Sequence, residues 1–356
     1  MSQKVKVLLV GAAFSADLHM DAYSRCPELA QIVAICDKDI SRVHSLAKRY
    51  GLSEYEAFED YGQAIAAGGY DVVDVCLPNF LHCDVVIKAL DAGFHAICEK
   101  PLAVTVAEGE KMLAAAQKAN KHIYYAEEWL FAPSLLKALE IVEEGGIGAP
   151  VFYRGRECHS GSHSPFAQTI QYCGGGSMVH LGIHPIGFML ALKDRQWTEL
   201  CAMTTGGLTH NMVQKTMEGE DWATCLIRFA DGSTAVLEAN YVTVGGMEDA
   251  VDIYGTQGCL HVDMTFTSPI SCFSVPGLSY TVEKADVTTG WSRPAVDEKF
   301  NLGYVGEIRH FMECAAKNVE AKIGLRGVDG YEALKVVNYI YQSAKEGRTI
   351  YNPALK

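Results

Sequence analysis

The chain has 356 residues, which is long for a single hydrophobic core and suggests two domains. Its composition, with 49% apolar and 21% charged residues, is ordinary for a globular protein and excludes a disordered or fibrous chain. The net charge of -13 disfavours a nucleic-acid or anionic-membrane surface, because both require a basic footprint.

The 12 cysteines are scattered, and several lie in apolar strand-like runs, such as Cys36, Cys76 and Cys98. We interpret them as small buried side chains in a reducing compartment. The first residues enter an apolar strand at once, without a signal-peptide pattern, and no apolar run approaches the roughly 18 residues of a membrane span. We therefore expect a cytoplasmic protein.

The first part of the chain alternates short β-branched runs with amphipathic segments. Strands are predicted at residues 5–11, 31–37, 71–78, 95–101 and 122–128, with helices near residues 17–26, 41–50, 82–92 and 105–120. Five strands joined by helices imply crossover connections and a parallel sheet. We therefore predict an α/β fold that begins with a doubly wound domain at residues 1–127.

The pattern changes after Pro133. A helix is predicted near residues 134–143, and strands then follow one another at residues 150–157, 199–207, 221–243 and 248–264. Asp231 and Gly232 supply the positive φ of a hairpin turn. Helices are predicted near residues 178–191, 305–317 and 330–346. Residues 128–356 are therefore expected to form an α+β domain with a mainly antiparallel open sheet, whose closing helices can pack back on the first domain.

A dinucleotide-binding loop is indicated where the first strand ends. Gly11 follows this strand, and Ala13 and Ala16 stand where the fingerprint usually has its second and third glycines. The methyl group of Ala13 lies where the backbone should approach pyrophosphate, so the loop alone also fits an ordinary turn. Asp37 ends the second strand about 20 residues later, where a carboxylate can accept both ribose hydroxyls and repels a 2′-phosphate. NAD is expected rather than NADP, with Lys38 softening the preference.

Glu99 and Lys100 directly follow a strand that reads as buried. The carboxyl ends of strands line the ligand crevice of an open parallel sheet, so we expect both side chains to face a ligand. The alternative is a surface ion pair between the two residues.

Together these motifs resemble the Gfo/Idh/MocA family of nicotinamide-dependent oxidoreductases over nearly the whole chain. The resemblance rests on the glycine loop with its trailing histidine (Gly11, Ala13, Ala16, His19), the third-strand motif (Pro78, Asn79, His82), the Glu-Lys-Pro signature (Glu99, Lys100, Pro101), the segment "GGGSMVHLGIHPIGFML" and the closing helices.

This resemblance implies a Rossmann domain and NAD-linked oxidation or reduction of a sugar, cyclitol or glycoside, in a pocket between the nucleotide domain and the sheet. Lys100 would hold the reacting oxygen, and His184 would accept the hydroxyl proton. A core histidine is the alternative for His184. The family also suggests homodimers or homotetramers. The expected cofactor-binding residues are Gly11, Ala13, Phe14, Ser15, Asp37, Lys38, Leu77, Pro78, Asn79, His82, Glu99, Lys100 and Glu128.

His180 departs from the family pattern, which usually has aspartate there. Residues i and i+4 share a helix face, so His180 and His184 would lie close together, and His184 would lack the anion that stabilises its protonated form. His180 is expected to replace the acid as a catalytic relay and substrate contact, or to be a passive contact. A third possibility joins both histidines to Glu157, His159 and His163 in a metal site, but we expect no metal.

Two further positions bear on the substrate. Many members carry asparagine and arginine where this chain has Glu128 and Leu130, which argues against a phosphorylated substrate. Arg154 and Arg156 keep a carboxylate possible, although such arginines are often only solvated, and Trp222 suits a sugar face as well as ordinary packing. The expected substrate contacts are Lys100, Arg156, His180, His184 and Trp222.

The leading prediction is thus an NAD-dependent dehydrogenase acting on a secondary hydroxyl of a carbohydrate or polyol. The alternative is a glycoside hydrolase or lyase that uses bound NAD transiently, as some members of this family do. A non-catalytic NAD sensor would not need Lys100, so it is disfavoured.

Overall fold

The computed structural model describes residues 4–162, 164–265, 268–277 and 289–355. The chain divides into two compact units. Unit 1 comprises Met1–Phe131 and Gly303–Leu334, and unit 2 comprises Ala132–Leu302 and Lys335–Lys356. The 12 cysteines all lie within the described residues and form no disulfide.

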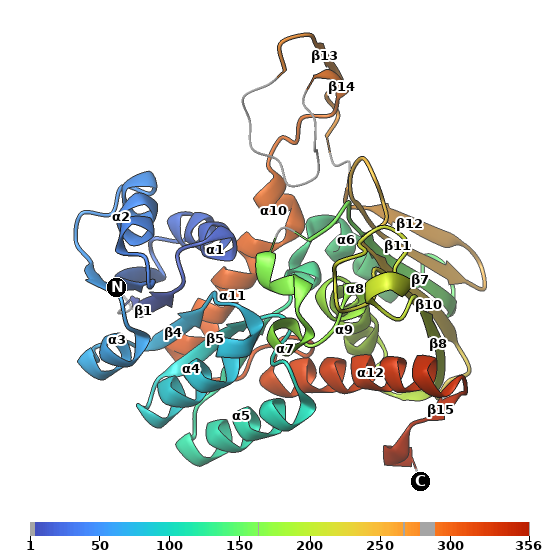
Figure 1. Cartoon of the computed structure of the whole chain (residues 1–356), viewed down its shortest axis with the longest axis horizontal. Helices are drawn as coiled ribbons and strands as arrows, with labels where there is room; N and C mark the ends of the chain where they lie inside the picture. The colour runs from blue at the N-terminus through green and yellow to red at the C-terminus, as the bar shows by residue number, and fades with distance from the viewer. Residues whose placement is uncertain (1–3, 163, 266–267, 278–288, 356) are drawn as a thin grey trace. The chain divides into compact units, whose positions relative to one another are not determined.

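Unit 1 is built on a six-stranded sheet in the order β3-β2-β1-β4-β5-β6, and every adjacent pair is parallel. The strands are β1 (Val5–Val10), β2 (Ala30–Cys36), β3 (Glu56–Phe58), β4 (Val72–Val75), β5 (His95–Glu99) and β6 (Ile123–Ala126). Every residue of β4, β5 and β6 is buried, as expected for strands covered on both faces. The predicted doubly wound parallel sheet is confirmed (Figure 1).

The helices of unit 1 are α1 (Phe14–Ser24), α2 (Ile40–Arg49), α3 (Tyr61–Ala67), α4 (Asn79–Asp91), α5 (Val106–Ala119), η1 (Glu128–Phe131), α11 (Tyr304–Lys317) and the start of α12 (Gly327–Glu346). Local sequence sets their ends: α5 begins with a capping box of Thr105 and Glu108 and ends at Asn120, which takes a left-handed conformation. The sequence prediction missed β3 and α3. The strand has only three residues and lies at an exposed edge, so it carries no apolar alternation.

Unit 2 contains a seven-stranded sheet in the order β12-β11-β7-β10-β9-β8-β15. Only β7 and β10 pair in parallel, so the predicted, mainly antiparallel sheet is confirmed. The strands are β7 (Pro150–Cys158), β8 (Trp197–Thr204), β9 (Trp222–Phe229), β10 (Thr234–Asn240), β11 (Glu248–Gly255), β12 (Cys259–Asp263) and β15 (Ile350–Tyr351). The predicted hairpin joins β9 to β10, and Gly232 in its turn has a φ of 86°.

The remaining elements of unit 2 are helical segments and one separate hairpin. They are α6 (Pro133–Glu143), η2 (Pro165–Gln168), α7 (Ile170–Cys173), α8 (Ser177–His180), α9 (Ile183–Leu192), η3 (Leu208–His210), β13 (Cys272–Ser274), β14 (Gly290–Ser292), α10 (Glu298–Leu302), the end of α12 and η4 (Pro353–Leu355).

The two faces of the unit 2 sheet differ in what covers them. A Cβ atom at Gly155 of β7 would lie 2.7 Å from Pro185 of α9, so α9 packs closely on the face to which Gly155 belongs. On β9, alternate residues are buried, whereas Leu226 between them is 55% exposed. Strand alternation therefore gives one covered and one open face.

The predicted helix at residues 178–191 is in fact broken. Segments Ile170–His180 and Ile183–Leu192 meet at 58°, because the backbone is interrupted at Leu181 and Gly182. A Cβ at Gly182 would lie 2.3 Å from Sδ of Met178, and Pro185 lacks the amide hydrogen that would continue a helix through this point. The expectation that His180 and His184 share one regular helix face is therefore wrong.

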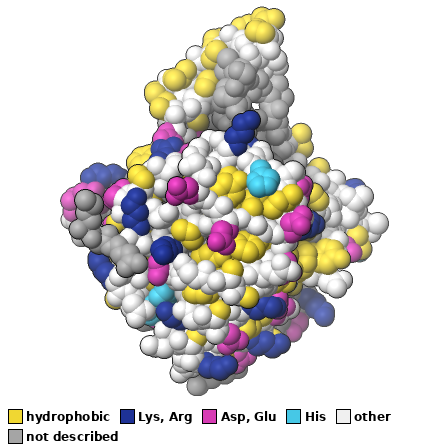
Figure 2. Space-filling view, turned by 90° about the vertical axis from the view of Figure 1, so that its left-hand side faces the viewer, with side chains coloured by type: hydrophobic (Ala, Val, Ile, Leu, Met, Phe, Trp, Pro, Cys, Tyr) yellow, Lys and Arg dark blue, Asp and Glu magenta, His cyan; other side chains and the backbone are white. Residues whose placement is uncertain are grey.

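No single helix among the described residues has both the length and the apolar character for a membrane span, and only the bent pair just described would qualify, by combined length and composition. On the face that Figure 2 shows, Lys and Arg side chains are interspersed with Asp and Glu among the described residues and do not gather into one basic surface.

Candidate active site

The carboxyl ends of the unit 1 strands bring the predicted cofactor residues to one edge of the sheet. The strand order reverses between β1 and β4, and ligands of open α/β sheets bind at such a switch point. The loops and helix starts that follow β1, β2, β4 and β5 carry Gly11 to Ser15, Asp37 and Lys38, Leu77 to Asn79, and Lys100.

Gly11 is the position in the β1–α1 loop that requires glycine. Its φ is 109°, and a Cβ atom there would lie 2.1 Å from the carbonyl oxygen of Cys76. Ala13 has an ordinary φ of -104°, so its methyl group causes no backbone strain. Because the Ala13 side chain cannot cap α1, the helix N-terminus is suited to phosphate oxygens.

Asp37 is held in place by the loops around it. Its Oδ2 accepts a hydrogen bond from the amide of Ala12 at 2.9 Å, and its Oδ1 accepts one from the amide of Asp39 at 2.9 Å. The Asp37 amide donates a hydrogen bond to the carbonyl oxygen of Phe58. Phe58 lines a hollow of about 520 Å³ together with Ile40, Ala57, Glu59, Asp60 and Gln63. The carboxylates of Asp37, Glu59 and Asp60 would repel a 2′-phosphate, so the residues fit NAD better than NADP.

His82 joins the loops that follow β4 and β5. Its ring is buried, with Nδ1 2.9 Å from the carbonyl oxygen of Pro101 and Nε2 2.8 Å from that of Leu77. Burial lowers the pKa of His82 despite these carbonyl contacts. His82 therefore holds the Lys100 loop in place.

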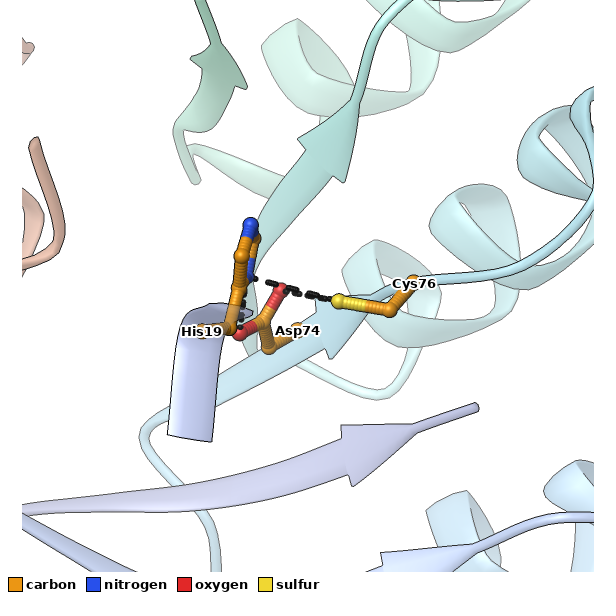
Figure 3. Close-up of side chains that lie close together, drawn as sticks. All are labelled: His19, Asp74 and Cys76. Atoms are coloured by element: carbon orange, nitrogen blue, oxygen red, sulfur yellow. Dashed lines mark hydrogen bonds and ion pairs between the residues drawn. The ribbon is translucent and has the colours of Figure 1, made fainter. Parts of the chain in front are cut away.

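A buried histidine, His19, lies between the carboxylates of Asp74 and Glu99, and Figure 3 shows its contact with Asp74. Nδ1 of His19 on α1 lies 2.9 Å from Oδ2 of Asp74 on β4, and Nε2 lies 3.2 Å from Oε1 of Glu99. The Tyr23 hydroxyl also donates to Oδ2 of Asp74, at 2.8 Å. Burial opposes a charge on His19, but Asp74 and the nearby Cys76 outweigh it and raise the pKa of His19 well above its usual value. His19 is thus an imidazolium between two carboxylates.

Glu99 is correspondingly kept ionised beside Lys100. Burial alone would raise the pKa of Glu99, but its hydrogen bond with His19 and the positive charges of His19 and Lys100 lower it. The other Glu99 oxygen, Oε2, accepts a hydrogen bond from the backbone amide of Lys100 at 3.0 Å. This carboxylate therefore fixes the backbone that presents the Lys100 side chain.

Two other buried acids of unit 1, Glu128 and Glu307, have raised pKa values and are influenced by the charge of Glu99. Burial raises the pKa of Glu128 to about 7, with Lys100 opposing the shift and Glu99 adding to it. Burial, and then Glu128, raise the pKa of Glu307 on α11 well above its usual value. Burial therefore favours the neutral form of Glu307, and Glu128 can gain or lose a proton near neutral pH, close to the charge of Lys100.

His184 and His180 of unit 2 each have a partner from another element. Nε2 of the buried His184 lies 3.9 Å from Oε2 of Glu157 on β7, so the expected lack of a carboxylate near His184 is wrong. Nδ1 of His180 is hydrogen-bonded to the hydroxyl of Tyr241 at 3.0 Å. Burial raises the pKa of Tyr241, so this hydroxyl stays protonated.

Arg156 and Trp222 contact other side chains than these histidines, and their role as substrate contacts stays a prediction. Arg156 pairs with Glu248 and Asp252, and Nε1 of Trp222 donates to Oε1 of Glu238 at 3.1 Å. Arg156 and Glu157 are neighbours on β7 and so point to opposite faces. The Glu238–Arg156 pairing places Trp222 with Arg156 on the open face. His163 lies outside the described residues.

Two family models cover most of the chain. Residues 5–127 match the model described as "Oxidoreductase family, NAD-binding Rossmann fold", and residues 135–261 match the "GFO/IDH/MocA C-terminal domain". The chain belongs to the Gfo/Idh/MocA family. It is therefore an NAD-binding oxidoreductase, as the sequence predicted.

Relatives within the Gfo/Idh/MocA family match almost the full length. A D-apiose dehydrogenase of Paraburkholderia graminis is 27% identical over 98% of this chain and 90% of the relative. A D-glucoside 3-dehydrogenase of Escherichia coli is 26% identical over 98% of both chains. The crystal structure of GenD2 from gentamicin A biosynthesis, in complex with NAD, has a TM-score of 0.88 at 22% identity, and the match covers 99% of this chain and 97% of GenD2.

Some members of the site were not found from the sequence. Asp74, Glu307 and Tyr241 were not selected, and His19 was noted only as part of the family loop. An acid inside the apolar run "DVVDVCLP" was a usable signal for Asp74, because a buried carboxylate requires a partner. No local pattern marked Tyr241, whose contact with His180 depends on the placement of α8 beside β10.

Proposed function

We propose that this Gfo/Idh/MocA oxidoreductase transfers hydride between NAD and a secondary hydroxyl or keto carbon of a sugar, cyclitol or glycoside. The observation that carries the proposal is the Glu99–Lys100 pair at the carboxyl end of β5, supported by His19 and Asp74. The names of the D-apiose and D-glucoside dehydrogenases support a carbohydrate or polyol substrate.

Lys100 is proposed to bind the reacting oxygen. When NAD is bound, its nicotinamide supplies the hydride acceptor. As hydride leaves the carbon, negative charge grows on the oxygen, and a fixed ammonium group stabilises this alkoxide-like state more than the neutral alcohol. The ionised Glu99 holds the Lys100 backbone and favours the charged form of the lysine.

His184 is proposed to accept the hydroxyl proton, so that loss of the proton and hydride leaves a carbonyl group. The Glu157 carboxylate at 3.9 Å stabilises the imidazolium that forms. His180 is proposed to contact the substrate through Nε2, since Nδ1 is engaged with Tyr241. Placing Lys100 and His184 at one oxygen rests on their match to the family motifs.

The alternative, a hydrolase or lyase that recycles NAD, is not favoured. The relatives reported above are named as dehydrogenases, and none of the contacts given above for the described residues specifically supports elimination of an aglycone. We further propose, from the family resemblance, a cytoplasmic homodimer or homotetramer, which light scattering would test.

The Lys100→Ala variant tests the proposed chemistry. We expect kcat to fall by about 10²- to 10³-fold, because a preorganised cation at the developing charge is removed. The Kd of NAD, followed by fluorescence, should change far less than kcat. Lys118→Ala is the control, because the Lys118 side chain is 78% exposed on α5. An unchanged kcat in Lys100→Ala would rule out the assigned role.

A further inference from the structure

Three side chains of types that bind metal ions, those of Glu157, His159 and Asp249, lie together in unit 2 on the covered face of its sheet. Glu157 and His159 are two residues apart in the chain, so they project on the same side of the strand direction, and Asp249 of β11 is the cross-strand partner of Glu157. Their exposed fractions are 6%, 5% and 3%. Two carboxylates and an imidazole are thus buried together.

The distances among these groups suit a single ion. Nε2 of His159 lies 3.3 Å from Oε1 of Glu157, and one ligand atom from each of the three residues lies within 4.8 Å of the others. Bonds of about 2.0–2.2 Å to a divalent ion place neighbouring ligand atoms about 3–3.5 Å apart. Small rotations of the Glu157, His159 and Asp249 side chains would therefore bring their ligand atoms to the separations that a bound ion requires.

The charges in this group also favour a cation. Carboxylates directly opposite each other on paired strands repel, and burial strengthens that repulsion. Strand alternation places Arg154 and Arg156 on the other face, where they pair with Asp252. A divalent ion would neutralise both Glu157 and Asp249.

A second histidine, from a separate element, lies beside the group and remains the proposed proton acceptor. Nε2 of His184 on α9 is 3.9 Å from Oε2 of Glu157, the oxygen that is not directed at His159. Another cluster, of His19, Asp74 and Cys76, lies in unit 1, and Figure 3 shows the contact of His19 with Asp74. Oδ2 of Asp74 also accepts a hydrogen bond from the Tyr23 hydroxyl.

We propose that Glu157, His159 and Asp249 form a binding site for a divalent transition-metal ion. A mixed imidazole and carboxylate set suits Zn²⁺, Mn²⁺ or Co²⁺ better than Ca²⁺ or Mg²⁺, which prefer oxygen ligands alone. From the sequence alone, we expected no metal site. Asp249 changes that expectation, because only the pairing of β11 with β7 brings it to the other two residues.

The test is metal binding by the full-length chain. Protein is dialysed against a chelator and then titrated with Co²⁺, and visible absorption and bound metal are measured. We expect about one ion per chain, and at least tenfold weaker binding in Asp249→Asn. Asp252→Asn is the matched control, since Asp252 lies on the same strand but faces the open side. Its binding should equal that of the unchanged chain.

Equal Co²⁺ binding by Asp249→Asn and Asp252→Asn, or no binding by the unchanged chain, would overturn the proposal. If Asp249→Asn does not fold, as judged by circular dichroism, Glu157→Gln is measured instead and is held to the same tenfold criterion. The result is separable from the proposed dehydrogenase activity. If the unchanged chain binds Co²⁺ but forms no NADH, only the dehydrogenase activity is contradicted. If it forms NADH but binds no Co²⁺, only the metal site is contradicted.

Discussion

The His19 interactions in unit 1 give a prediction that combines stability and activity. His19→Gln removes a buried cation that lies 2.9 Å from Asp74 and 3.2 Å from Glu99. Breaking a buried ion pair by removing one partner costs about 3–5 kcal/mol, because the remaining charge stays buried. Asp74→Asn alone should cost a similar amount. The double variant should lose less than the sum, with a coupling free energy of about 1.5–3 kcal/mol.

Urea unfolding followed by circular dichroism, in the unchanged chain and the three variants, measures this coupling. The pH dependence provides a second readout. Since the pKa of His19 is raised on folding, its stabilisation is complete below about pH 6.5 and declines as pH rises through the folded pKa. His19→Gln should lack that decline. Additive free energies, or an unchanged pH slope in His19→Gln, would refute the assignment of His19 as a buried imidazolium.

Three further predictions concern the cofactor loop, the ribose acid and a buried carboxyl group. Gly11→Ala should destabilise the chain by about 2–5 kcal/mol, because the added Cβ has no room. Gly93→Ala is the control and should cost only about 1–2 kcal/mol, because Gly93 has a φ of 89° but nothing lies within 4 Å of the added Cβ. Equal melting temperatures of the two variants would contradict the crowding at Gly11. Asp37→Asn should weaken NAD binding by about 10-fold or more and NADP binding much less, as calorimetry would measure. Burial raises the pKa of Glu220 from 4.5 to about 7, so the folded chain holds a proton that the unfolded chain has lost between these pH values. Stability should therefore fall by up to about 3 kcal/mol as pH rises through that window, and urea unfolding of Glu220→Gln should show a flatter profile.

Much of the fold could be predicted because local pattern and tertiary structure agree. The parallel sheet of unit 1 follows from apolar strands separated by helices, and capped ends such as Thr105 mark the boundaries. The break between α8 and α9 was missed because the segment is apolar throughout. Gly182 and Pro185 were visible in the sequence, but their effect depends on close packing against Met178.

The candidate site was predictable only where it follows linear motifs. Gly11, Asp37 and Lys100 each follow a strand, and the carboxyl ends of parallel strands meet at one edge. Contacts across the unit 2 sheet depend instead on strand register, which sequence spacing does not supply. Register places Asp249 beside Glu157 and, by alternation, carries Arg156 to the opposite face.

Net NADH formation is the most direct test of the central claim that this Gfo/Idh/MocA oxidoreductase is a dehydrogenase using Lys100. Purified protein is incubated with NAD, and separately with NADP, and a panel of sugars, inositols and aryl glycosides, while absorbance at 340 nm and aglycone release are followed. We expect NADH in proportion to oxidised substrate, a preference for NAD, and loss of the signal in Lys100→Ala. Aglycone release without net NADH would contradict it in favour of the NAD-recycling glycosidase.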